Sequence, residues 1–176
     1  MKRLGITLGF ITGMMTAIGT KAVNAKPMTR QEYNDFRGWQ LPENENGADE
    51  GYLVEYQGSE PNTTEYQGYV SWSPKYQFEQ AYEDVKGGLS FGHAVELLKG
   101  GHRVARQGWN GKGMFLFVVK GATVTEAIED CYGDPAKKGV HTALDAIYMH
   151  TVQGNLVPWL ASQTDMLSED WQVVNA

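Results

Sequence analysis

The sequence predicts an α+β protein made of two small domains, each a short antiparallel sheet with one or two helices packed on it. Short runs of β-branched and aromatic residues alternate with turns rich in Gly, Asn and Pro, which is typical of hairpins. Helix-capping patterns precede several amphipathic stretches, and a charged, glycine-ended segment, residues 83–88, separates the two halves. Small domains bury a low share of their surface, so we also expect an oligomer.

The domain limits that we predict are an N-terminal extension at 1–14, a first domain at 15–84 and a second domain at 89–175. The extension has a weak signal-like pattern, because Lys2 and Arg3 precede an apolar run and Ala25 lies in a small-residue stretch. That run is too short and interrupted to span a bilayer. We favour translation from Met14 or Met15, a first strand at 18–26 and a cytoplasmic location in the host cell, with secretion as the alternative.

The first domain is predicted as a small αββα unit. Thr29 and Glu32 form a capping-box pattern, which predicts a helix over 30–37 that Gly38 closes. The other elements expected here are strands at 52–56 and 69–72 and a helix that begins with Ser73 as cap and Pro74 in its first turn and runs to about Tyr82.

The second domain begins with a helix that Ser90 caps. Its apolar residues Phe91, Ala94, Val95 and Leu98 recur at helical spacing, and Gly100 and Gly101 stop it. The elements expected after it are strands at 102–106 and 114–119 around the turn at 108–111, a helix at 122–131, a loop at 133–142, a hairpin of 145–152 with 156–158, a capped turn near Ser162 or Thr164, and a last strand at 171–174.

Charge and cysteine content exclude several classes. The net charge is −6 and acidic residues concentrate at 43–60, so we expect no long nucleic acid as partner. No segment predicts a membrane span. The lone cysteine, Cys131, cannot form an intrachain disulfide, and the histidines lack zinc-type spacing, so we expect no metal and no cofactor. We expect Cys131 to be a buried or half-buried small hydrophobe.

Two stretches carry candidate binding residues. Arg103 and Arg106 precede the Trp109-Asn110 turn, and residues 158–165 combine Trp159 with Ser, Thr and Asp. An exposed indole can stack on a planar heterocycle while the polar groups select its edge or a ribose hydroxyl, which would suit a nucleotide-like ligand. The alternative is that both tryptophans are core residues and the Ser, Thr and Asp are helix caps.

A catalytic interpretation is weaker, and we predict no enzyme and no catalytic residue. The carboxylates Glu126, Glu129, Asp130 and Asp134 fit a charged surface segment, and His150 fits a solvent-facing strand position. Neither a phosphate-binding glycine loop nor a catalytic triad order occurs in the sequence. A hydrolase of a nucleotide signal remains the least favoured alternative, behind a structural or protein-interaction module of phage origin.

Three stretches, residues 89–94, 104–116 and 156–171, resemble the second Thoeris anti-defence family of phages and prophages, first described as a domain of unknown function. They include Gly-Trp-Asn-Gly-Lys and Pro-Trp-Leu-Ala-Ser-Gln-Thr-Asp. Residues 121–144 depart from the familiar pattern, in which many relatives carry a proline-rich strand and loop. The first half resembles a small phage accessory domain often found alone or fused to this module.

The resemblance implies a sponge that binds a cyclic nucleotide signal of the glycocyclic ADP-ribose type and holds it uncleaved. The implied assembly is a homotetramer or other homo-oligomer with pockets between subunits. The ligand-binding residues that we predict on this basis are Phe91, Arg106, Trp109, Asn110, Trp159, Ser162, Thr164 and Asp165.

Overall fold

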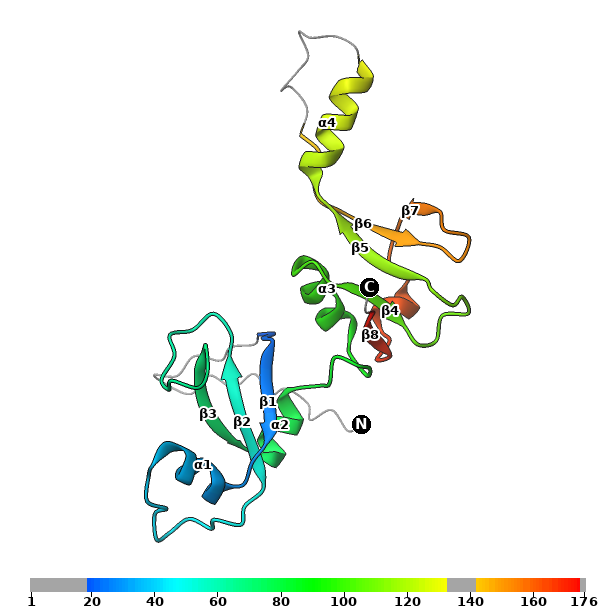
Figure 1. The fold of residues 1–176 in the computed structure, drawn as a ribbon. Helices are drawn as coiled ribbons and strands as arrows, with labels where there is room; N and C mark the ends of the chain where they lie inside the picture. Colours follow the sequence, from blue (N-terminus) through cyan, green and yellow to red (C-terminus); the bar gives the residue numbers. More distant parts are fainter. Residues whose placement is uncertain (1–18, 133–141, 175–176) are drawn as a thin grey trace, which may run out of the picture. The chain divides into compact units, whose positions relative to one another are not determined.

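The computed structural model describes residues 19–132 and 142–174. The chain divides into two compact units, and the boundary along the sequence falls between Ser73 and Pro74. Unit 1 contains a three-stranded sheet of order β1-β2-β3, and unit 2 contains a five-stranded sheet of order β7-β6-β5-β4-β8 (Figure 1). Helices accompany both sheets. The predicted α+β class with two small antiparallel sheets is therefore confirmed. The predicted translation start at Met14 or Met15 lies outside the described residues.

Unit 1 follows the predicted order of elements. It comprises β1 (Val23–Pro27), α1 (Arg30–Arg37), β2 (Gly51–Tyr56) and β3 (Tyr69–Pro74). The Thr29 side chain caps α1 and Glu32 returns a hydrogen bond to the Thr29 backbone, so the capping box is confirmed. Gly38 ends α1 with a φ of 67°, a left-handed conformation that glycine adopts without steric cost. The core of the unit is formed by Tyr33, Leu53 and Val70.

The start of α2 (Lys75–Ala81) differs from the prediction. Ser73 was expected as its cap, but Pro74 occupies the cap position and no side chain caps the helix. The reason is that β3 extends through Pro74, whose ψ of 144° is not helical, so α2 begins at Lys75 and Ser73 lies one residue too early to cap it. A strong capping residue is therefore overridden here by strand pairing.

Unit 2 places its last strand beside its first. Its elements are α3 (Phe91–Lys99), β4 (Arg103–Arg106), β5 (Phe115–Val119), α4 (Gly121–Tyr132), β6 (Ala146–His150), β7 (Leu156–Pro158), α5 (Gln163–Met166) and β8 (Trp171–Val174). Each matches a predicted element to within a few residues. β8 pairs antiparallel with β4, with Val104 opposite Val173 and Arg106 opposite Trp171. The predicted loop at 133–142 lies almost entirely outside the described residues.

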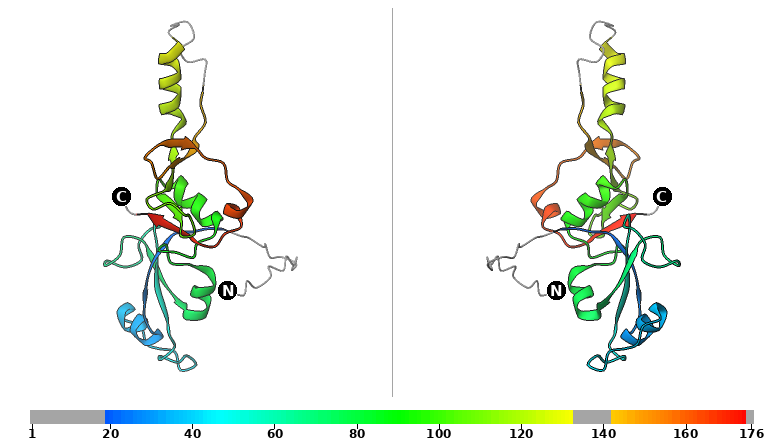
Figure 2. Two further views of the ribbon diagram at one scale, coloured as in Figure 1. Left: turned by 90° about the vertical axis from the view of Figure 1, so that its right-hand side faces the viewer. Right: turned by 90° about the vertical axis from the view of Figure 1, so that its left-hand side faces the viewer.

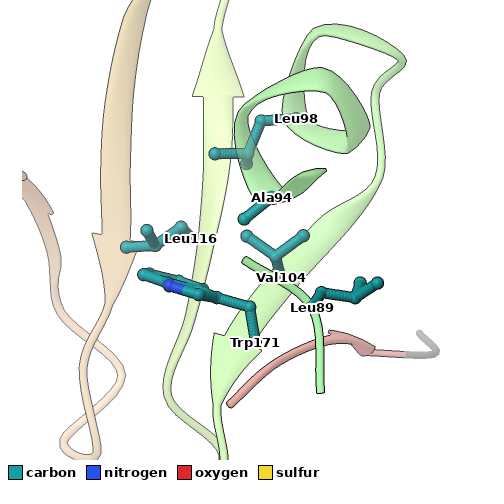
Figure 3. Packing of buried hydrophobic residues seen from close by; sticks show 6 residues of the cluster. All are labelled: Leu89, Ala94, Leu98, Val104, Leu116 and Trp171. Carbon is teal, nitrogen blue, oxygen red and sulfur yellow. The ribbon is translucent and has the colours of Figure 1, made fainter. Parts of the chain in front are cut away.

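One face of the five-stranded sheet, which we call the inner face, carries the core of unit 2. Helix α3 packs against it, and Ala94 and Leu98 point from the helix toward Val104, Leu116 and Trp171 (Figure 3). These residues are 0 to 1% exposed. Burying a side chain of this size contributes about 1.5–3 kcal/mol, so this layer supplies much of the unit's stability.

The cap of α3 gives a first testable prediction. Ser90 Oγ accepts the backbone N–H of His93 at 3.4 Å. Replacing Ser90 with alanine leaves that N–H unpaired and should cost about 1 kcal/mol in the free energy of unfolding, measured by urea denaturation. As a control, Glu96→Gln removes only an exposed ion pair on the same helix and should change stability by less than about 0.5 kcal/mol. Equal losses would show that the cap is not what stabilises the helix.

Within the described residues, no helix has the length and apolar character needed to cross a bilayer.

Candidate functional site

Four aromatic rings meet beside the core of unit 2, and we call them the four-ring cluster. Its members are Phe91 on α3, Trp109 in the turn after β4, Trp159 just after β7 and Trp171 on β8. The Trp171 ring lies 5.6 Å from the rings of Phe91 and Trp109 and 6.2 Å from that of Trp159. Trp171 is 0% exposed, whereas the other three rings are half-buried. The central indole thus supports three rings that keep part of their surface open to solvent.

Asp165 holds two of these indoles in place. Its Oδ1 accepts the Trp109 indole N–H at 3.2 Å, and its backbone carbonyl accepts the Trp171 indole N–H at 3.1 Å. Its Oδ2 accepts the Ser162 hydroxyl at 2.6 Å, while Ser162 Oγ accepts the Asp165 backbone N–H at 3.1 Å. Ser162 and Asp165 therefore form the capping box of α5. The cap of the short helix and the orientation of the Trp109 indole therefore depend on the Asp165 carboxylate, whereas the Trp171 indole is held by the backbone of the same residue.

Arg106 joins Asp165 to a second carboxylate, Asp170, and we call these three residues the ion-pair network. Arg106 Nη1 donates to Asp165 Oδ1 at 2.9 Å, while Nε and Nη2 donate to the two Asp170 oxygens at 2.8 and 3.3 Å. Asp170 Oδ2 also accepts the Gly108 backbone N–H at 2.9 Å. The fork of Arg suits such a paired contact. The network ties the turn that carries Trp109 to the segment between α5 and β8.

The environment of the ion-pair network lowers the pKa of both carboxyl groups. Burial opposes ionisation of Asp165, but the hydrogen bonds from Ser162, Arg106 and Trp109 outweigh it and lower its pKa. The Arg106 hydrogen bond lowers the pKa of Asp170 against a smaller effect of burial. Both carboxylates raise the pKa of Arg106 above its already high ordinary value. The network is therefore fully charged at neutral pH.

These pKa shifts predict how the stability of unit 2 depends on pH. A carboxyl group whose pKa is lower in the folded state stabilises that state above its unfolded pKa of about 3.9. This contribution is lost as the pH falls through the lower, folded pKa. We expect the free energy of unfolding to decrease below about pH 4, as measured by urea denaturation at successive pH values. The decrease should be shallower in a variant with Asp165→Asn and Asp170→Asn, and an unchanged slope would contradict the assignment.

The structure brings together all but one of the residues predicted to bind ligand. Six of them contribute to the four-ring cluster or bond directly to its support: Phe91, Arg106, Trp109, Trp159, Ser162 and Asp165. Thr164 lies beside them, with its hydroxyl 2.8 Å from the Ser162 hydroxyl and its backbone carbonyl 3.5 Å from Arg106 Nη1. Asn110 follows Trp109 but is exposed and has no hydrogen-bond partner among the described residues. The binding roles of these residues stay predictions.

Both alternatives raised for these residues hold in part. Trp109 and Trp159 pack against the core, and Ser162 with Asp165 caps a helix, as the structural interpretation expected. The same rings are half-exposed, as stacking on a ligand requires. Arg106 and Asp165 already bond to one another. They would therefore act on a ligand indirectly, by holding the aromatic rings in one orientation.

Three other residues differ from expectation. Cys131 is exposed rather than buried or half-buried, because α4 extends away from the sheet instead of packing on it. His150 does lie on the face opposite the core, but it is half-buried and stacks on Phe115 with ring centroids 4.7 Å apart. Arg103 lies on that same face, because successive strand residues alternate, so it is separated from Arg106.

The candidate carboxylates on α4 are Glu126, Glu129 and Asp130. Glu126 and Asp130 are exposed and Glu129 is half-buried, whereas Asp134 is outside the described residues. Across the part of the chain that the structure describes, we find no group of three or more His, Cys, Asp and Glu side chains arranged to hold a metal ion.

Sequence reasoning missed two residues of the site, Trp171 and Asp170. Trp171 is the centre of the four-ring cluster and Asp170 completes the ion-pair network. Both lay in the stretch 156–171 that carries the family resemblance, and Trp171 was also the start of the predicted last strand, but neither was given a role in the site. The apolar residues that begin with Trp171 could have indicated that this strand is buried. They could not have indicated that Trp171 lies beside Arg106, because that depends on the pairing of β8 with β4.

Unit 2 is a small α+β module in which helix α3 packs on one face of a five-stranded antiparallel sheet. Aromatic rings that are held in place and half-exposed lie at the start of this helix. The chain belongs to the Thoeris anti-defense 2-like family, whose model matches residues 89–174. This part of the chain is similar to the protein Thoeris anti-defense 2 of Bacillus phage SP01, with 37% identity over 91 residues, which cover 52% of this chain and 100% of that relative. The family predicted from the sequence is thereby confirmed.

Proposed function

We propose that this protein is a phage anti-defence sponge that binds a cyclic-ADP-ribose-type nucleotide signal and holds it without cleaving it. Membership of the anti-defence family supports the role, and the family description names no enzymatic activity. The observation that carries the binding proposal is the four-ring cluster, because its half-exposed rings offer surfaces on which an adenine can stack.

The arrangement around the cluster favours binding over catalysis. Arg106, Asp165 and Asp170 are engaged with one another and with the indoles, which holds the rings in one geometry before a ligand arrives. Such preorganisation raises affinity because little side-chain entropy is lost on binding. The same carboxylates have lowered pKa values, so neither suits the role of a general acid at neutral pH.

We propose that the sponge is a homotetramer or another homo-oligomer that acts in the host cytoplasm, with the ligand between subunits. Two surface hollows of the described residues lie elsewhere, one along α4 and one in unit 1 around Tyr56 and Tyr69. The four-ring cluster contributes to neither. A second copy of the chain would supply the opposite wall that a ligand at the cluster needs to lose contact with water.

Native mass spectrometry tests this proposal directly. The purified protein is measured alone and with isomers of cyclic ADP-ribose, cyclic dinucleotides and cyclic trinucleotides. A sponge gives a discrete oligomer that gains a whole number of intact ligands, and heat denaturation returns the ligand unchanged. Chemically altered ligand would overturn the sponge and favour a hydrolase. An oligomer that gains no ligand across the panel would favour a protein-interaction module.

A further inference from the structure

The sheet of unit 2 has a second apolar face, which we call the outer face. The strand register places Phe115 opposite His150 and Phe117 opposite Tyr148 on this side. Phe115 stacks on His150 and the Arg103 guanidinium lies 4.9 Å from the Phe115 ring centroid. Antiparallel sheets that face water usually carry polar residues on the solvent side. An aromatic outer face is typical of a sheet that is covered on both sides.

Helix α4 provides a second apolar surface. It leaves the sheet where β5 ends and returns to β6 through residues 142–145, so we call it the arm (Figure 1, Figure 2). Four of its residues recur at i, i+3, i+4 and i+7, and these form the arm stripe: Val124, Ala127, Ile128 and Cys131. Ile128 is 39% exposed and Cys131 is exposed. Among the described residues, this stripe has no packing partner in the core of unit 2.

The base of the arm is tied to the sheet. Lys120 Nζ bonds to Asp145 at 2.8 Å, and the Gly121 backbone N–H bonds to the same carboxylate at 2.9 Å. Thr125 Oγ1 accepts the Ala143 backbone N–H at 2.8 Å. The arm therefore leaves the sheet in a defined direction. A helix of 12 residues is marginal in water without tertiary packing, so the arm gains stability if its stripe is covered.

We infer that the arm of one copy lays its stripe on the outer face of a second copy, and that the second copy returns the same contact. This arm exchange rests on the homo-oligomer of the proposed function. It pairs a helix with an uncovered sheet face, which is the two-layer packing that α+β proteins use within a chain. A contact that is reciprocated in this way is isologous and closes on itself.

Charge supports a second copy as the occupant. The acidic residues of the arm, Glu126, Glu129 and Asp130, lie on the side opposite its stripe. At the outer-face positions of the described strands there is no carboxylate, and Arg103 is the one permanent charge. An arm laid stripe-down on this face therefore buries none of its own carboxylates and meets no like charge on the partner.

Area also favours exchange over simple pairing of two arms. A stable interface buries about 800 Å² on each partner, which one short helix packed on another cannot reach. Arm exchange buries two stripes and two sheet faces in each dimer. It therefore covers both the arm stripe and the outer face, and it leaves the four-ring cluster open.

The lone cysteine makes this inference testable. We would co-express an untagged chain carrying natural Cys131 with a tagged chain carrying Cys131→Ser and Tyr148→Cys, then add a short bismaleimide. Arm exchange predicts a product joining the tagged to the untagged chain. The matched control replaces Tyr148→Cys with Lys99→Cys on α3, an exposed position away from the outer face, and should give no such product.

Other outcomes overturn the inference in distinguishable ways. Products that join only two Cys131 residues mean that arms pair with each other, and an oligomer without a product between Cys131 and Tyr148→Cys means that neither surface is the interface. Both leave the sponge intact if the oligomer binds nucleotide. A monomer in native mass spectrometry would overturn arm exchange and the proposed homo-oligomer together.

A second variant avoids dependence on the cross-link. Ile128→Asp places a charge in the centre of the arm stripe and should raise the midpoint concentration of dissociation at least about tenfold. When both chains are measured as monomers, below their dissociation concentrations, the far-ultraviolet circular dichroism and the thermal midpoint of the variant should be close to those of the natural chain, because Ile128 is not part of the core. Glu126→Gln on the opposite side of α4 is the matched control and should leave the oligomer unchanged. Equal dissociation constants for the natural chain and Ile128→Asp would overturn the inference.

Discussion

Replacing Arg106 with alanine is expected to lower the free energy of unfolding of unit 2 by about 3–5 kcal/mol. The guanidinium side chain is 19% exposed and bonds to both Asp165 and Asp170. Removing the Arg106 guanidinium leaves the Asp165 and Asp170 carboxylates close together without the positive charge that pairs with both of them. Domains of this size have roughly 5–15 kcal/mol of stability, so the variant should be near the limit of folding. Urea denaturation followed by tryptophan fluorescence measures the change.

The same strand offers the control. Arg103 lies on the outer face, is exposed, and its guanidinium lies against the Phe115 ring, so Arg103→Ala should cost about 1 kcal/mol or less. Adding Asp165→Asn and Asp170→Asn to Arg106→Ala should recover part of the loss, because the uncompensated charges are then removed. Similar losses for Arg103→Ala and Arg106→Ala would show that the ion-pair network does not stabilise the unit.

The sequence was sufficient for elements whose signals are local. α1 and α3 were each predicted from a capping residue and a closing glycine, with a helical apolar stripe as a third signal in α3, and these features lie within the helix or next to it. The start of α2 was predicted wrongly, because pairing along β3 decides whether Ser73 is a cap or a strand residue. That pairing involves residues far away in the sequence.

The candidate site shows the same division. Residues 158–165 and the Trp109 turn were recognised as stretches of unusual composition, and the structure brings them together. What composition could not provide was the centre, Trp171, because its place follows from β8 lying beside β4. The exposure of Cys131 was missed for a related reason: burial was predicted from the residue type of a lone thiol, whereas its actual exposure depends on how α4 leaves the sheet.

Replacing Trp159 with alanine is expected to weaken nucleotide binding about 10- to 100-fold, because stacking of one base on an aromatic ring contributes about 1–3 kcal/mol. Trp159 is half-buried at the edge of the four-ring cluster, 6.2 Å from Phe91 and 6.5 Å from Trp109. Its indole is not a donor in the ion-pair network, unlike that of Trp109. Because Trp159 also packs against the core, circular dichroism must first show that the variant is folded under the conditions of the binding measurement. Isothermal titration with the nucleotide identified by native mass spectrometry measures the affinity.

Trp39 in unit 1 provides a matched tryptophan for this comparison. It is 52% exposed and packs edge-on against Tyr33, outside the four-ring cluster. Trp39→Ala should leave the dissociation constant of the nucleotide within about twofold, since it removes an indole without changing the proposed stacking surface. If Trp39→Ala weakens binding as much as Trp159→Ala, the nucleotide is not held by the cluster alone and unit 1 takes part in its site. If neither variant changes the affinity while both stay folded, the stacking surface lies elsewhere.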